Sequence, residues 1–272
     1  RVAEYAVHHK IKKTLDYQDV FSKGIERRID GAPFYLKPFL KIEYQRLLNY
    51  ERDIFDRFDN RIIISAPDRE LIPHPERAKI VVVANGVDDS FFHPMDAEKK
   101  YDLVFTGNMS YPPNIESAEY LVNKILPVLQ KSQPDINLLI AGASPHLRVL
   151  SLRSANVKVT GWVVDIRDCY ASAKIFIAPM QIGTGLQNKI LEAMAMQIPC
   201  ITSPLAFSAL GAKEGKDILV AQAPAEYAHH ISDLLNNPGL AAEIARNGYE
   251  FVRRHFNWAT ETQKIDDLIM GK

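Results

Sequence analysis

The most informative stretch of this sequence is Pro179-Met-Gln-Ile-Gly-Thr-Gly-Leu-Gln-Asn-Lys-Ile-Leu-Glu-Ala-Met-Ala195. A short apolar run before it predicts a strand that ends at Pro179, and the amphipathic pattern after the glycines predicts a helix over 185–196. Gly183 and Gly185 give the connecting backbone its freedom, and Thr184 is the expected helix cap. The stretch therefore predicts a strand, a glycine-rich loop and a helix in that order.

This loop has the chemistry of an anion-binding site. The first N–H groups of a helix point outward at the positive end of its dipole, so a diphosphate would fit against Thr184, Gly185 and Leu186, with Lys189 as a point charge. Glu192 follows on the same helical face, and its carboxylate could accept two hydroxyl protons from a ribose. The alternative is a loop that caps a buried helix, with Lys189 and Glu192 solvated. Spacing alone does not decide between the two.

Short β-branched runs alternate with helical patterns from residue 79 onward, as in a parallel sheet covered by helices on both faces. This predicts a doubly wound α/β domain with ligands at the carboxyl edge of the strands. Seven strands are expected, at 79–84, 101–106, 136–141, 157–160, 174–178, 199–202 and 218–220. Helices are expected at 114–129, 145–152, 166–172, 185–196, 224–235, 240–254 and 259–270.

The first part of the chain differs in texture and is expected to be the remainder of another domain. It contains a predicted helix over 38–58 and a strand over 61–65. Glu51 lies on the apolar stripe of that helix and is interpreted as a helix-edge ion pair. Asn85-Gly86 predicts a turn near the border. We expect an acceptor-side remainder at 1–78, a nucleotide-binding domain at 79–254 and a terminal helix at 255–272 that can cross back.

Composition excludes several classes of protein. Lys plus Arg and Asp plus Glu both total 33, so there is no field of one sign to hold nucleic acid. Cys169 and Cys200 lie in apolar stretches without metal-ligand spacing and are expected to be reduced core residues. No apolar run approaches the ~20 residues of a membrane-spanning helix. Because the chain begins at Arg1, we expect it to lack an amino-terminal part.

The stretch 179–195 resembles the donor-binding motif of family 4 glycosyltransferases, in which a proline and a glycine-rich loop precede a helix of the form Lys, any, any, Glu, Ala, Met, Ala. The resemblance extends over nearly the whole chain and is nearest to bacterial enzymes of exopolysaccharide or cell-surface glycan assembly. The other matching segments follow in family order: Leu15-Asp16-Tyr17-Gln18-Asp19-Val20 with Ser22, Arg46 to Glu51, Asn85-Gly86-Val87-Asp88 with Phe92 and Pro94, Phe105-Thr106-Gly107, Ala141-Gly142, Gly161-Trp162-Val163 with Asp165, and Pro199 to Thr202.

The resemblance implies the GT-B fold, with two Rossmann-like domains, and assigns residues to the donor site. Glu192 would hold the ribose, and the loop Gly183 to Leu186, with Lys189, the diphosphate. Backbone groups of Trp162 and Val163 would flank the base, unless Trp162 only plugs the sheet edge. The remaining assigned donor residues are Gly107, Asn108 and Gly142.

Three departures from the family pattern leave the catalytic residues unknown. Thr184 stands where many members have a glutamate that touches the donor sugar, and Asn108 stands where many have an arginine. Many members also have a lysine further on, and Tyr111-Pro112-Pro113-Asn114 contains none. Each lost cation matters, because fixed positive charge stabilises a diphosphate leaving group.

The resemblance implies retaining, hexosyltransferase-like transfer from a nucleoside diphosphate sugar to a glycan or lipid-linked acceptor, in the cytoplasm. It implies no cofactor, and the absence of an Asp-any-Asp motif predicts metal independence. A peripheral contact with the inner face of the membrane would fall to the missing part, because no basic amphipathic helix stands out here. The alternatives are a non-catalytic nucleotide- or glycan-binding module on the same fold and an unrelated α/β protein such as an epimerase.

Overall fold

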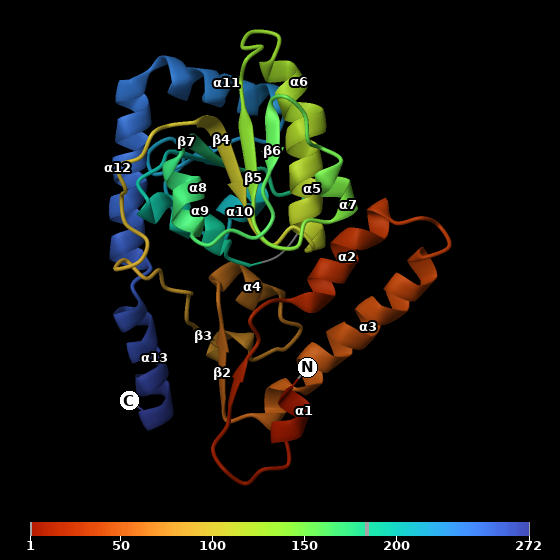
Figure 1. Cartoon of the computed structure of the whole chain (residues 1–272). Helices are drawn as coiled ribbons and strands as arrows, with labels where there is room; N and C mark the ends of the chain where they lie inside the picture. The colour runs from red at the N-terminus through yellow and green to blue at the C-terminus, as the bar shows by residue number, and fades with distance from the viewer. Residues whose placement is uncertain (1, 183–184, 272) are drawn as a thin grey trace. The chain divides into compact units, whose positions relative to one another are not determined.

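A computed structural model describes residues 2–182 and 185–271, and the chain divides into two compact units (Figure 1). Unit 1 comprises Arg1–Gly86, Ile182–Leu186 and Trp258–Lys272, and unit 2 comprises Val87–Gln181 and Gln187–Asn257. The unit borders after Gly86 and Asn257 lie close to the domain borders at 78 and 254 that the sequence suggested. As a division into separate domains, that suggestion stays a prediction.

Unit 2 is built on a six-stranded parallel sheet with the strand order β6-β5-β4-β7-β8-β9. The direction of strand addition reverses between β4 and β7, which makes this the switch point where doubly wound sheets bind ligands. The strands are β4 (Tyr101–Thr106), β5 (Leu138–Ala141), β6 (Val157–Val159), β7 (Ala173–Ala178), β8 (Cys200–Thr202) and β9 (Leu219–Val220). The expected doubly wound α/β architecture is thereby confirmed.

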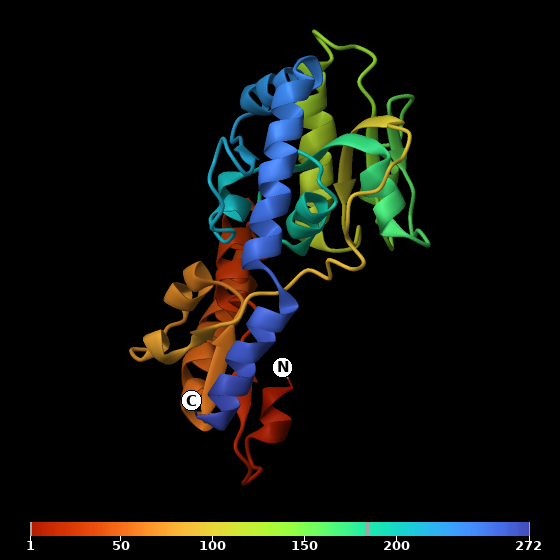
Figure 2. The ribbon, with the colours of Figure 1, turned by 90° about the vertical axis from the view of Figure 1, so that its left-hand side faces the viewer.

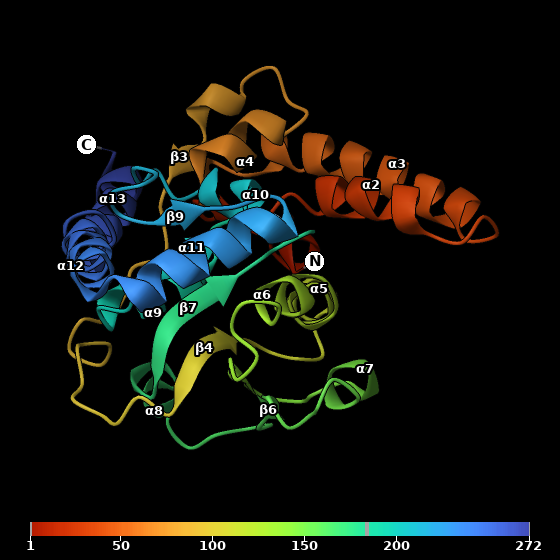
Figure 3. The same ribbon diagram turned by 90° about the horizontal axis from the view of Figure 1, so that it is seen from above.

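Helices pack on this sheet, with α12 beside α9 and α11 beside α6 (Figures 2 and 3). The helix expected over 114–129 contains a π-helical segment, because Pro127 has no N–H to continue the α-helical ladder. The helices are α5 (Pro112–Tyr120), the π segment (Leu121–Ile125), α6 (Leu126–Leu129), α7 (Leu147–Leu150), α8 (Ile166–Ala171), α9 (Asn188–Ala195), α10 (Pro204–Phe207), α11 (Pro224–Asn236) and α12 (Pro238–His255).

Unit 1 contains a second, three-stranded parallel sheet with the order β1-β2-β3. Its strands are β1 (Thr14–Asp16), β2 (Asn60–Ile63) and β3 (Val81–Val82). The prediction that the strand at 79–84 belongs to the nucleotide-binding sheet is therefore wrong: this strand is β3, which pairs with β2. An isolated apolar run shows that a strand forms, and long-range pairing decides which sheet it joins.

The helices of unit 1 include a pair, α2 and α3, that the sequence foresaw only in part. Its helical elements are α1 (Ala3–Ala6), α2 (Phe21–Gly31), α3 (Lys37–Asp53), η1 (Phe55–Arg57), α4 (Ala66–Leu71), η2 (Arg77–Lys79) and α13 (Trp258–Met270). In the part of the chain that the structure describes, no helix combines the length and apolar character needed to cross a membrane.

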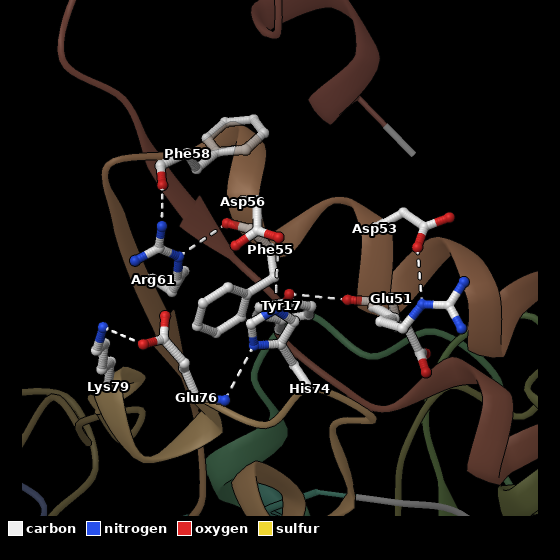
Figure 4. A network of polar contacts seen from close by, with 11 residues as sticks. Tyr17, Glu51, Asp53, Phe55, Asp56, Phe58, Arg61, His74, Glu76 and Lys79 are labelled. Atoms are coloured by element: carbon white, nitrogen blue, oxygen red, sulfur yellow. Dashed lines mark hydrogen bonds and ion pairs between the residues drawn. The ribbon is translucent and has the colours of Figure 1, made fainter.

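An aromatic stack closes the core of unit 1 where η1 meets β2 (Figure 4). Phe55 is fully buried, with the Arg61 guanidinium 4.2 Å from its ring centroid and the His74 ring stacked at 3.7 Å. Arg61 also donates hydrogen bonds to the carbonyl oxygens of Phe55, at 2.9 Å, and Phe58. The guanidinium thus satisfies the carbonyls at the end of η1 while its plane covers the aromatic core.

The ion-pair interpretation of Glu51 is wrong. Its side chain is buried, and its carboxylate accepts hydrogen bonds from the backbone N–H of Ser22, at 3.0 Å, and from the Ser22 hydroxyl. Ser22 lies in the first turn of α2, so Glu51 caps the positive end of that helix from α3. The apolar pattern of α3 cannot predict this role of Glu51, because the helix that it caps is α2.

The turn predicted at Asn85-Gly86 is also wrong. No turn is formed at these two residues, and neither has a positive φ. Gly86 instead allows a close approach, because a Cβ atom at this position would lie 2.6 Å from the Trp258 ring, at the start of α13. The glycine serves packing within unit 1 rather than a chain reversal.

In unit 2, the loops after β4 and β5 touch through their backbones. The Gly107 N–H donates to the Ala141 carbonyl at 3.1 Å, and the Met109 N–H donates to the Ala143 carbonyl at 2.8 Å. A Cβ atom on Gly142 would lie 1.8 Å from the Gly107 carbonyl oxygen. Only glycine permits this approach, so Gly142 fixes how the two loops sit at the edge of the sheet.

We expect Gly142→Ala to destabilise unit 2 by about 3 kcal/mol or more, because the added methyl group meets backbone and Gly142 has a φ of +141°. Chemical denaturation measures the change. Gly24→Ala in α2 is the matched control, since no atom lies within 4 Å of the new methyl group there. An unchanged unfolding midpoint in Gly142→Ala would contradict the packing described.

Candidate functional site

Five of the predicted donor residues follow three neighbouring strands of unit 2, β4, β5 and β6, where these strands end. Gly107 and Asn108 follow β4, Gly142 follows β5, and Trp162 and Val163 follow β6. The Gly142 N–H donates to the Gly161 carbonyl at 3.2 Å, which holds the third loop beside the first two. Because the Trp162 side chain is 73% exposed, the alternative in which it plugs the sheet edge is wrong.

Asn108 shapes its own loop. Its side-chain oxygen accepts hydrogen bonds from the N–H of Ser110 at 3.0 Å and from the Ser110 hydroxyl at 2.8 Å. Its carbonyl oxygen accepts a hydrogen bond from the side-chain amide of Asn114 at 2.8 Å. Asn108 therefore forms a side-chain turn at this edge and brings no positive charge.

Glu192 is held in place by a buried tyrosine. The Tyr170 hydroxyl, on α8, donates to one carboxylate oxygen of Glu192 on α9 at 2.7 Å, and it lies 2.7 Å from the Thr106 hydroxyl at the end of β4. Since the tyrosine proton goes to Glu192, Thr106 must donate to Tyr170. Tyr170 is fully buried. The chain Thr106, Tyr170, Glu192 thus ties the carboxylate to the central strand.

The Glu192 carboxylate keeps acceptor capacity that this chain does not use. Tyr170 is the donor it has among the described residues, and a carboxylate has about four lone-pair sites. Burial raises the pKa of Glu192, while the Tyr170 hydrogen bond and the charge of Lys189 act against the rise. The interpretation in which Glu192 is simply solvated is wrong, because the side chain is partly buried and hydrogen-bonded.

The side chain of Lys189, on α9, reaches a neutral partner on α5. Its ammonium donates to the side-chain oxygen of Asn114, in the first turn of α5, and lies 5.1 Å from the centroid of the Phe105 ring. Within the described residues no ion pair joins it to a carboxylate. Burial lowers the pKa of Lys189 to about 8. The ammonium is thus a partly desolvated cation whose charge is not cancelled by a contact partner.

The glycine-rich loop departs from the expected geometry. The helix was expected from residue 185, but α9 begins at Asn188, after Gln187 at its amino-terminal cap. Two assigned residues, Gly183 and Thr184, lie outside the described residues. Gly185 and Leu186 precede the helix, so their N–H groups do not belong to its first turn. Hydrophobic periodicity shows that a helix forms here but cannot fix the residue at which it starts.

Gly185 and Leu186 have partners within unit 1. The Gly185 N–H hydrogen-bonds the Asp68 carboxylate, and the Leu186 side chain is buried. Asp19 also comes close, since a Cβ atom on Gly185 would lie 3.5 Å from its carboxylate oxygen. A diphosphate at Gly185 would have to displace the Asp68 carboxylate from that N–H.

A hollow of about 400 Å³ in unit 1 does not share this chemistry. It lies between β1, α2 and α3, and apolar side chains such as Leu47, Ile54 and Phe58 dominate its wall. The charged residues of the wall are all acidic: Asp16, Asp19, Glu43 and Glu51. An anionic ligand would be repelled there, so we do not assign this hollow to a donor.

The structure brings in three residues that the sequence had not assigned. Asn114 positions Lys189, and Thr106 and Tyr170 position Glu192. Thr106 belongs to the matching segment Phe105-Thr106-Gly107, and Asn114 ends the segment that lacks the family lysine. Tyr170 had the weaker signal, because one aromatic residue in an apolar helix predicts core packing. Among the described residues, no group of three or more His, Cys, Asp or Glu side chains could hold a metal ion.

Comparison with solved structures gives the same fold. The Anabaena protein Alr3699/HepE, in a complex with UDP, superposes with a TM-score of 0.77 at 15% identity over 99% of this chain and 75% of that one. Sucrose-phosphate synthase from Thermosynechococcus elongatus gives a TM-score of 0.75 at 16% identity, over 98% of this chain and 69% of that one. Both are GT-B proteins, and the expected GT-B fold is confirmed.

Sequence comparison gives the family. A curated relative, an uncharacterised 44.6 kDa protein from the cps region of Klebsiella pneumoniae, is 24% identical over 266 residues, which cover 92% of this chain. The chain spans 65% of the length of that relative. The family model of the group 1 glycosyl transferases matches residues 100–237. Since that match covers half of the chain and most of unit 2, the chain belongs to the group 1 glycosyl transferases.

Proposed function

We propose that this chain carries the donor site of an enzyme that transfers a sugar, with retention of configuration and without a metal ion, from a nucleoside diphosphate sugar to a glycan or lipid-linked acceptor. The observation that carries the proposal is the meeting of Glu192, held by Tyr170, and Lys189, held by Asn114, at the carboxyl edge of one parallel sheet. A carboxylate suits a ribose diol, and an ammonium suits a diphosphate.

Each end of the donor has a matching group. Ribose hydroxyls would donate to the Glu192 oxygens that Tyr170 leaves open, and the diphosphate would lie toward Lys189. Because Asn108 takes the place of the family arginine and is occupied by Ser110, more of the charge neutralisation falls to Lys189. The exposed Trp162 and the half-buried Val163 remain the candidates for the base. Gly107 and Gly142 would let the donor approach the backbone closely.

Retention, metal independence, family 4 and a cytoplasmic site rest on the sequence resemblance. The cps-region relative supports a role in exopolysaccharide assembly. The UDP complex of the Anabaena protein makes UDP sugars the first donors to test. The non-catalytic alternative is favoured by Thr184 and Asn108, which stand where many members of the family have charged residues.

The test is a thermal-shift screen of UDP, GDP, ADP and TDP sugars, in which a ligand that binds only the folded state raises the melting temperature. For the natural full-length protein, transfer to an acceptor, with the anomeric configuration of the product read by NMR, supports the enzyme. Binding without transfer or slow donor hydrolysis supports the non-catalytic module. No shift with any nucleotide sugar would refute both.

We expect Glu192→Ala to weaken binding of the nucleoside diphosphate by about 1.5 to 3 kcal/mol, roughly ten- to a hundredfold in Kd, the scale of hydrogen bonds to a charged group. Isothermal calorimetry measures the change. Inorganic pyrophosphate is the matched ligand, because it has no ribose and its affinity should not fall. Glu250→Ala, at an exposed position of α12, is the control variant. Unchanged nucleotide affinity in Glu192→Ala would remove the ribose assignment.

We expect nucleotide affinity to decline above pH 8. The pKa of Lys189 is lowered to about 8 in the free protein, and a bound diphosphate would raise it, so binding favours the protonated lysine. The affinity is then complete below pH 8, and Kd rises about tenfold between pH 7 and pH 9.

The matched control for this pH dependence is Lys189→Arg, since an arginine stays charged over the whole range and should bind with a nearly flat profile. Any ionisation of the base affects both proteins equally, so the difference between the two profiles reports on residue 189. Parallel profiles would show that the charge of Lys189 does not contact the diphosphate.

A further inference from the structure

The turn between α2 and α3 exposes an unusual set of apolar side chains. The two helices pack side by side within unit 1 and join at the tip of a hairpin, drawn in red and orange in Figures 1 and 3. Five large apolar side chains at this tip are exposed: Phe34 (85%), Tyr35 (60%), Leu36 (42%), Phe39 (70%) and Ile42 (60%). A contiguous exposed set of this size marks an interaction surface. We call these five residues the hairpin tip.

The exposure at the start of α3 belongs to one face. Phe39 and Ile42, three residues apart, lie on one side of the helix, and Phe34, Tyr35 and Leu36 lie in the turn before it. The opposite stripe, which includes Leu40, Tyr44, Leu47 and Leu48, is half-buried. The first turns of α3 are therefore apolar on two sides, and α2 can cover only one of them. The two stripes overlap in sequence, so no amphipathic surface helix was apparent from the sequence.

Cations flank the hairpin tip. Arg28, Lys37 and Lys41 stand next to it or within it, against the carboxylates of Asp30 and Glu43, although the whole chain has no net charge. Lys41 and Arg28 are exposed, and the Lys37 ammonium donates to the carbonyl oxygen of Asp30 at 3.3 Å. The positive charge of this part of the chain is thus local and lies next to the aromatic rings.

We infer that the hairpin tip docks on the surface of a lipid bilayer that contains anionic headgroups. Aromatic and aliphatic side chains can enter the boundary between headgroups and acyl chains, while lysine and arginine side chains reach back to the phosphates. The cores of protein interfaces are depleted in lysine, so Lys37 and Lys41 within the apolar set favour a bilayer over a protein partner. This surface is independent of the donor site proposed above, and vesicle binding tests it without any nucleotide.

The test is co-sedimentation of the whole chain with vesicles of phosphatidylcholine, with and without phosphatidylglycerol. Binding is expected with the anionic vesicles and should weaken at high salt. Lys37→Gln with Lys41→Gln should lower the partition coefficient about thirtyfold, because two basic residues near an anionic surface are removed. Phe34→Ser with Phe39→Ser should lower it on the order of tenfold or more, because the apolar contact is lost.

The matched control is Lys10→Gln with Ile11→Ser, which removes an exposed cation and an exposed apolar side chain elsewhere in unit 1. It should bind vesicles like the parent chain. Circular dichroism of each variant verifies that it is folded. In addition, Phe39→Trp should be quenched by brominated lipids, which reports insertion of the tip in a protein that keeps its aromatic side chain.

Three results would overturn the inference. The parent chain could ignore anionic vesicles, or the control could lose as much binding as the tip variants. The third result is that light scattering shows the parent chain to be a dimer and the tip variants to be monomers, while none of them binds vesicles. The hairpin tip would then hold two copies of the chain together.

Discussion

The hydroxyl of Tyr170 is the contact on which the candidate site depends. It connects the end of the central strand β4, through Thr106, to Glu192 on α9. Tyr170 is fully buried, so its hydroxyl must find hydrogen-bond partners inside the protein. Leaving a buried polar group unpaired destabilises the fold by about 1 to 3 kcal/mol. A surface carboxylate would sample many rotamers. Glu192 is instead held in one place relative to the strand edge before any ligand arrives, which is the preorganisation that binding sites need.

Glu192 and Lys189 lie three residues apart on α9, yet no ion pair between them is formed in the described residues. The carboxylate is bonded to Tyr170 and the ammonium to Asn114, and both partners are neutral. A direct ion pair would cancel the two charges and offer a ligand little. With neutral partners, the lysine keeps its attraction for an anion and the glutamate keeps its unused lone pairs. The arrangement therefore suits a ligand that is anionic at one end and rich in hydroxyls at the other.

The sequence predicted local elements well and their partners poorly. Strand β4 was predicted with both ends correct, because an apolar run there is followed directly by Gly107. The run at 79–84 was placed in the wrong sheet, since strand pairing is a long-range choice. The carboxyl edge that carries Gly107, Gly142 and Trp162 follows from the alternation of strands and helices. The Tyr170 contact does not, because it joins residues 22 apart through a hydroxyl that helical periodicity cannot distinguish from a core ring.

The sequence also could not distinguish carboxylates with a structural role from Glu192, the one proposed to bind a ligand. In the structure they differ in the groups that donate hydrogen bonds to them. Glu51 accepts a hydrogen bond from the backbone N–H of Ser22, and Glu261 from that of Ala84 at 2.8 Å. Asp68 is likewise bonded by the N–H of Gly185. Each of these carboxylates satisfies a backbone donor that would otherwise be left unpaired, which accounts for its burial. Glu192 satisfies no backbone donor among the described residues. Its carboxylate keeps lone pairs that Tyr170 does not use, and in the proposed site the hydroxyl groups of a ligand would fill them.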